Sequence, residues 1–102
     1  MAVLYITEYA EMQIGPAGRS GQMPMDPPLA EQTVAIGGSS TASAAFNAAT
    51  RFVRLHTDAI CSIEFGTAPT ATATTGRMAA NQTEYRGVPL GQSFKVAVIS
   101  NT

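Results

Sequence analysis

An apolar residue at every second position is the pattern that most constrains how this chain folds, because side chains on a β-strand alternate between two faces. The clearest example is the segment 50–58, TRFVRLHTD, which is followed at once by 59–66, AICSIEFG. The alternation predicts one set of residues on the buried side of both strands: Val53, Leu55, Thr57, Cys61, Ile63 and Phe65. Arg54 and His56 fall on the opposite, polar side of the first strand.

The connection between these two strands is short, and it allows two arrangements. A tight turn at 58–60 makes a hairpin in which residue 55 pairs with 63, and Arg54 then lies across from Glu64 as an opposite-charge pair. The alternative is a crossing from one sheet to another at the same turn. Both arrangements keep the two segments as strands.

Other segments have strand composition as well. Residues 2–9, AVLYITEY, are β-branched and aromatic, and alternation sets Leu4, Ile6 and Glu8 on one face. The segments 31–37, 82–88 and 93–99 are also expected to be strands, with a proline-glycine turn at 89–92 between the last two. These patterns predict six or seven short strands.

Helical periodicity is hard to find. The alanine-rich segment 39–52 has only Phe46 and Phe52 as large apolar residues, and their spacing does not form a helical stripe, so we expect it to be extended or irregular. The predicted fold is all-β, a compact antiparallel β-sandwich or jelly-roll-like barrel. At 102 residues we expect a single domain spanning 1–102.

Residues 10–30 interrupt the strand pattern. Their glycines and prolines argue against a helix interior or a central strand, so we expect an irregular arm or loop. Five adaptable apolar side chains make it a candidate contact segment for a neighbouring subunit: Met12, Ile14, Met23, Met25 and Leu29. The alternative is a loop folded over one end of its own sandwich.

A second unusual segment, 66–80, begins with GTAPTATATTG and carries almost no charge. Threonine hydroxyls cap turns and alanine is buried without loss of rotamer freedom, so the composition favours a packed loop. A mobile surface loop is the alternative. We regard Thr70, Thr72 and Arg77 as further candidate interface residues.

Charged residues form only 13% of the chain, about half the usual share. A weakly charged exterior suits a protein that is covered by another surface, because small neutral side chains cost little to desolvate; a neutral, soluble β-protein is the alternative. The six basic residues are scattered, which argues against nucleic acid as a partner. No long apolar run or basic leader occurs, so we expect no membrane association and synthesis in a cytoplasm.

The residue types that usually carry chemistry are sparse. His56 is the only histidine and has no nucleophile at a recognisable spacing, and the single Cys61 lies among apolar residues, where a thiol acts as a small hydrophobe. Neither zinc nor EF-hand spacing occurs. We therefore expect no enzyme activity, no cofactor and no metal site.

The segment 51–99 resembles small structural proteins encoded among bacteriophage head genes. The similarity lies in VRLHTDA at 53–59, EFGTAPTATAT at 64–74, RMAANQTEY at 77–85 and KVAVI at 95–99. Such proteins include head decoration, or cement, proteins that bind the lattice of the major capsid protein. The resemblance implies a capsid-surface location in a virion made in a bacterial host cytoplasm, with the major capsid protein as partner and a homotrimer as one form of self-association.

Two other functions fit a small β-fold. One is a tail, head-tail or receptor-contacting component of the virion. The other is a small-ligand or sugar-binding β-module, for which we would expect clustered aromatic residues or paired carboxylates. The chain has no Trp and only Tyr5, Tyr9 and Tyr85.

Overall fold

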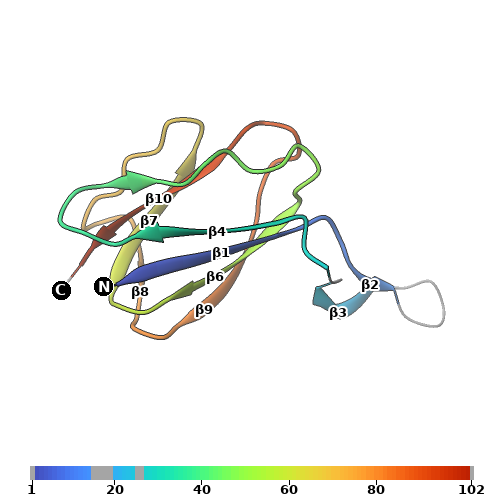
Figure 1. Cartoon of the computed structure of the whole chain (residues 1–102), viewed down its shortest axis with the longest axis horizontal. Helices are drawn as coiled ribbons and strands as arrows, with labels where there is room; N and C mark the ends of the chain where they lie inside the picture. Colours follow the sequence, from blue (N-terminus) through green and yellow to red (C-terminus); the bar gives the residue numbers. More distant parts are fainter. Residues whose placement is uncertain (1, 15–19, 25–26, 102) are drawn as a thin grey trace.

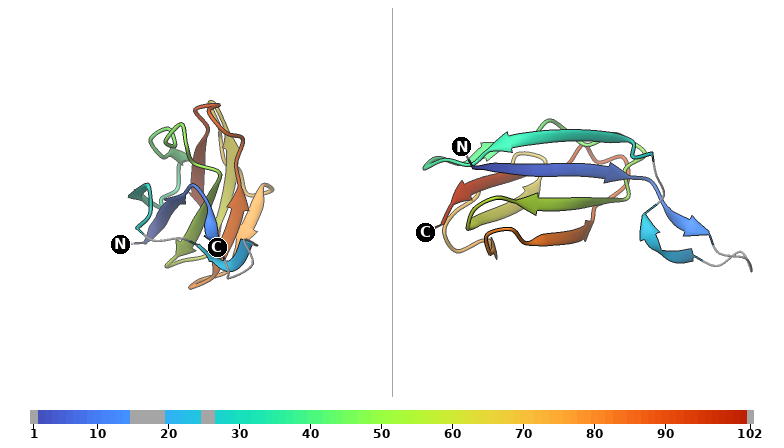
Figure 2. Two further views of the ribbon diagram at one scale, coloured as in Figure 1. Left: turned by 90° about the vertical axis from the view of Figure 1, so that its right-hand side faces the viewer. Right: turned by 60° about the horizontal axis from the view of Figure 1, so that its bottom comes forward.

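The computed structural model describes residues 2–14, 20–24 and 27–101, and it is an all-β sandwich of two four-stranded antiparallel sheets. The right-hand panel of Figure 2 shows the strands of the first sheet side by side. Sheet I contains, in spatial order, β4 (Ala30–Ala35), β1 (Val3–Tyr9), β6 (Phe52–Thr57) and β9 (Thr83–Gly87). Sheet II contains β5 (Thr41–Ala42), β10 (Lys95–Ser100), β7 (Cys61–Gly66) and β8 (Gly76–Met78). The predicted fold class is confirmed in its sandwich form.

The core lies between the sheets and is built from alternate residues, as the sequence predicts. On β1 the residues Leu4, Ile6 and Glu8 point inward, and on β6 the inward residues are Val53, Leu55 and Thr57; all six are buried. Sheet II supplies the other half of the apolar core: Cys61, Ile63, Met78, Val96 and Val98. Phe65 packs against this cluster and is only partly buried.

The hairpin expected between 50–58 and 59–66 is wrong, and the alternative crossing is confirmed. β6 belongs to sheet I and β7 to sheet II, so Arg54 pairs with Thr7 and Tyr85 across the strands, whereas Glu64 pairs with Ala97. The Thr57 hydroxyl stabilises the turn, since it donates to the carbonyl of Ala59 and accepts from the Ala59 N–H. A short turn can therefore connect strands of two different sheets as well as two strands of one hairpin.

The chain also crosses between the sheets after β9, so the proline-glycine segment 89–92 joins two sheets and not two neighbouring strands. The strand count among the described residues is higher than the predicted six or seven, because four short strands were not expected: β5, β8 and the two strands of a separate ribbon. Met78 on β8 is fully buried and pairs with Cys61. The segment 39–52 is irregular apart from β5, as expected.

The expected irregular arm contains a two-stranded ribbon. β2 (Met12–Ile14) pairs with β3 (Ser20–Pro24), and Figures 1 and 2 show this pair projecting beyond one end of the sandwich. The ribbon is inserted between β1 and β4, which already lie side by side where it leaves, because the Leu29 N–H donates to the Glu8 carbonyl at 2.8 Å. It is not folded over the end of the sandwich.

A buried carboxylate fixes the long connection before β6. Glu8 is 2% exposed, and its Oε1 accepts hydrogen bonds of 2.7 Å from the Asn47 N–H and from the Thr50 hydroxyl. Gln32 donates to the other oxygen at 3.4 Å and accepts from the Ala44 N–H at 3.0 Å. These bonds satisfy a charge that is costly to bury, and they hold residues 44–50 against sheet I.

Candidate contact surfaces

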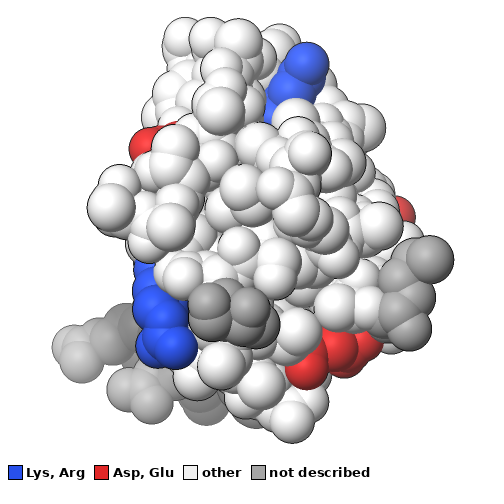
Figure 3. Space-filling model, turned by 90° about the vertical axis from the view of Figure 1, so that its left-hand side faces the viewer, with Lys and Arg blue, Asp and Glu red and all other residues white. Residues whose placement is uncertain are grey.

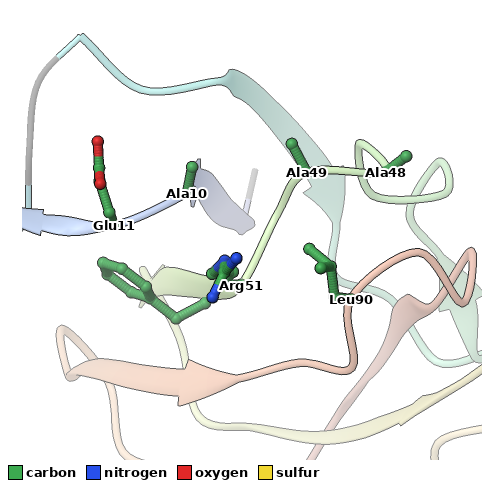
Figure 4. Close-up of a pocket in the computed structure, with 7 residues that line it drawn as sticks. Ala10, Glu11, Ala48, Ala49, Arg51 and Leu90 are labelled. Atoms are coloured by element: carbon green, nitrogen blue, oxygen red, sulfur yellow. The ribbon is translucent and has the colours of Figure 1, made fainter.

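The end of the sandwich from which the ribbon projects carries an open hollow. It lies between the root of the ribbon, the segment before β6 and the connection from β9 to β10 (Figure 4). The lining residues are Ala10, Glu11, Ala48, Ala49, Arg51, Phe52 and Leu90. The lining combines one carboxylate and one guanidinium with small and apolar groups, and these residues do not form a set of nucleophile, base and acid.

The predicted interface residues fall into two separate regions. Met12 and Ile14 lie on β2 and Met23 on β3, whereas Met25 lies outside the described residues. Leu29, at the root of the ribbon, is exposed.

The other three candidates are far from the ribbon. Thr70 and Thr72 lie in the loop after β7 and Arg77 on β8, and all three are exposed. Figure 1 shows that loop over the opposite part of the molecule. The structure therefore does not bring the two groups of candidates together.

The outward side of sheet I, called here the tyrosine face, gathers the aromatic residues that the sequence analysis counted singly. All three tyrosines lie on it, with Tyr5 43% and Tyr85 52% exposed. Tyr5 is next to His56, with ring centroids 6.3 Å apart, and the Tyr9 ring stacks on Phe52 at 5.3 Å. The face is open and shallow, and Glu31, Thr7 and Arg54 lie across its middle: these three belong to β4, β1 and β6.

The outward side of sheet II is partly covered by the chain itself, although Glu64 and Arg77 on the same side are exposed. Ser62 and Ala97 alternate with core residues, so they point outward, yet both are fully buried. The Asn101 amide donates to the Ser62 hydroxyl at 2.7 Å and to the Ala73 carbonyl at 3.1 Å, which holds the alanine-threonine loop on this side.

The same loop is anchored at a second point. The Ala71 N–H donates to the Ser40 hydroxyl at 2.9 Å, and Ala71 is 2% exposed. A turn closes the loop, since the Thr75 N–H and hydroxyl both donate to the Thr72 carbonyl. The loop is thus anchored at two points, at Ala71 and Ala73, although most of its residues are exposed.

Charge is sparse on the surface and is scattered. Figure 3 shows the end opposite the ribbon as largely uncharged. Within the described part of the chain, the one ion pair joins Arg86 to Glu84 at 2.7 Å, and Gln82 also donates to that carboxylate. This cluster lies on β9, an edge strand, where charged side chains oppose unwanted strand pairing.

His56 and Cys61, the two potentially reactive residues, make contacts typical of structural side chains. His56 Nδ1 lies 2.8 Å from the Thr83 hydroxyl on the tyrosine face. Burial raises the pKa of the Cys61 thiol; the hydrogen bond to Thr57 opposes this rise and the nearby Glu84 charge adds to it. The described residues contain no group of three or more His, Cys, Asp or Glu placed to hold a metal ion, and no helix suited to crossing a membrane.

Comparisons with protein-family models, with curated proteins and with solved structures find no match to this chain.

Sequence reasoning missed the tyrosine face, although its signal was present. Tyr5 and Thr7 alternate with core residues on β1, and Arg54 and His56 do so on β6. Only the pairing of β1 with β6, and of β6 with β9, reveals that these outward residues form one surface.

Proposed function

We propose that this chain is a virion structural protein of a bacteriophage, and that it decorates the head by binding the lattice of the major capsid protein. The observation that carries the proposal is the β2–β3 ribbon, which extends from a rigid sandwich and leaves the body of the protein. A projecting ribbon gives a small protein reach to a neighbouring subunit. The resemblance of residues 51–99 to proteins of phage heads supports the same function.

The surface of the sandwich agrees with such a role. Its exposed residues are mainly small and neutral, and charged residues are 13% of the chain. A standard protein interface buries about 1,600 Å² in total, which the ribbon and the hollow at its root can supply together with the capsid surface. Repetition over a shell strengthens a modest contact through multivalency.

The ribbon can be removed without disturbing the strands that flank it. Replacement of residues 11–28 by Asn-Gly leaves Tyr9 opposite Leu29 and closes β1 onto β4 through a short hairpin loop. We expect this variant to keep the melting temperature within a few degrees, because the core lies between the sheets, and to lose binding to capsids that lack the protein. Glu64→Gln, on the far side of the sandwich, is the matched control and keeps binding.

Particle composition tests the proposal directly. Heads purified from the phage that encodes the chain should contain it in a fixed ratio to the major capsid protein, and heads made without it should come apart at lower temperature. A copy number far below that of the capsid subunits would indicate the tail or head-tail role instead. Absence from purified particles would contradict both virion functions.

A further inference from the structure

The tyrosine face has two opposite charges placed symmetrically about one strand. Glu31 pairs with Thr7 across β4 and β1, and Thr7 pairs with Arg54 across β1 and β6, so the three residues form one row. Glu31 and Arg54 are therefore two strand spacings apart, about 9.6 Å. Among the described residues, neither side chain forms an ion pair or a hydrogen bond.

A two-fold axis that runs along β1 makes this row complementary to itself. When a second copy lies face to face with the first, the axis places each Glu31 opposite the partner's Arg54, and Thr7 lies opposite its own counterpart. Such contacts between identical patches are the usual form of a homodimer interface. A neutral ligand would gain nothing from this reciprocal placement of charge.

The neighbouring residues match under the same rotation. Tyr5 lies on β1 and stacks over the Tyr5 of the second copy, where exposed rings supply apolar area. Thr33 lies opposite His56, and Leu29 lies opposite Phe52, which pairs an exposed apolar residue with an aromatic one. No like charges meet on the face.

We propose that the tyrosine face binds the tyrosine face of a second copy of this chain, with reciprocal Glu31–Arg54 pairs across a two-fold axis along β1. The rotation keeps both ribbons at the same end of the dimer. The inference concerns the free protein and does not depend on the capsid proposal. It predicts a dimer, whereas the sequence resemblance gave a homotrimer as one form of self-association.

The expected association is weak. With the axis along β1 the two copies overlap over β4, β1 and β6 only, a width of about 14 Å. This contact is smaller than a standard interface of roughly 800 Å² per partner, so we expect a dissociation constant of about 100 μM or higher. Sedimentation equilibrium between about 20 μM and 1 mM should therefore show a monomer–dimer equilibrium. A monomer at the highest concentration, or a trimer, would overturn the proposal.

Variants that reverse the charge of Glu31 or Arg54 test whether these residues pair across the dimer interface. Arg54→Glu and Glu31→Arg should each weaken self-association about tenfold, because each variant puts like charges opposite one another twice. A mixture of the two single variants should associate at least as well as the natural chain, since both pairs are then attractive. The double variant should recover self-association to within about threefold. Glu64→Arg, on the outward side of sheet II, is the control and changes nothing.

The position of the axis has its own test. Thr7→Cys places a thiol on the axis, so a short bis-maleimide should join two copies, whereas Thr83→Cys on β9 lies far from its counterpart and should not react this way. The native Cys61 is buried and does not compete.

If Arg54→Glu leaves association unchanged, or if the natural chain stays monomeric and maltohexaose shifts the resonances of the tyrosine face instead, the face binds something other than a second copy.

Discussion

The outward sides of the two sheets differ, although both sheets are four-stranded and antiparallel. On sheet II the outward residues Ser62 and Ala97 are fully buried, and Asn101 connects Ser62 to the chain's own loop, whereas on sheet I Tyr5 and Tyr85 remain open to solvent. The difference arises from the long connections. The loop after β7 returns over its sheet, while the insertion between β1 and β4 projects away.

Hydrogen bonds from small polar side chains hold the loop after β7 against its sheet. The loop over sheet II is held by Ser40 and Asn101, which bond to its backbone at Ala71 and Ala73. Alanine and threonine lose little side-chain entropy on packing, so a few hydrogen bonds are enough to order the loop. Part of the outward side of sheet II is thus covered by the chain, whereas Tyr5 and Tyr85 on sheet I are exposed.

The largest expected difference, between the tyrosine face and the core, is in thiol reactivity. Cys61 lies in the core, and burial raises its pKa, so little reactive thiolate is accessible in the folded protein. In the Thr7→Cys variant the second thiol lies on the tyrosine face. With Ellman's reagent we expect that thiol to react at least about a thousandfold faster than Cys61, because Cys61 requires opening of the core. Similar rates would mean that the core opens readily.

A carboxylate introduced on the outward side of sheet II should lower the free energy of unfolding more than one introduced on the outward side of sheet I. Ala97→Glu puts a carboxylate at a fully buried outward position and should lower the free energy of unfolding by about 3 kcal/mol or more. Thr33→Glu on the exposed side of β4 is the matched change and should cost about 0.5 kcal/mol or less. Urea denaturation measures both. Equal losses would show that the outward position of Ala97 is not closed to solvent.

The anchor of the loop should have a smaller effect. Asn101→Ala removes the donor to the Ser62 hydroxyl and to the Ala73 carbonyl, and we expect a loss of about 1 to 2 kcal/mol. Amide exchange at Ala71 should become faster, while amides of β1 keep their protection. Unchanged exchange in the loop would indicate that Ser40 alone is sufficient to hold it.

The smallest effect is expected for truncation of an exposed ring. Tyr85→Ser removes a side chain that is 52% exposed on an edge strand, and it should change the free energy of unfolding by about 0.5 kcal/mol or less. Phe46→Ser, in the core, is the contrasting variant and should be strongly destabilising. A large loss for Tyr85→Ser would mean that the tyrosine face contributes to folding.

Alternation predicted the faces of the strands but not their partners. The inward residues of β1, β6 and β7 follow directly from a period of two, and the core confirms them. The pairing of 55 with 63 failed because the turn at 58–60 suits either a hairpin or a crossing, and no local pattern distinguishes the two. The three-residue strand β8 is too short to show alternation, although Met78 is a central core residue.

The hydrogen bonds of Glu8 and the tyrosine face were harder to predict, because both depend on segments that are distant in sequence. Glu8 alternates correctly with Leu4 and Ile6, yet its burial depends on donors from Asn47 and Thr50, which are distant in sequence. The tyrosine face requires three strands in register, so it is a property of the pairing and not of any one segment.

A dilution series followed by two-dimensional NMR tests the central claim most directly, namely that the tyrosine face is the side of the sandwich open to a partner. We predict that amide resonances near Glu31, Thr7 and Arg54 shift between about 20 μM and 1 mM, as expected for a weak two-fold contact, while those near Glu64 and Arg77 on sheet II stay fixed. Shifts that cluster on sheet II, or none on either sheet, would contradict it.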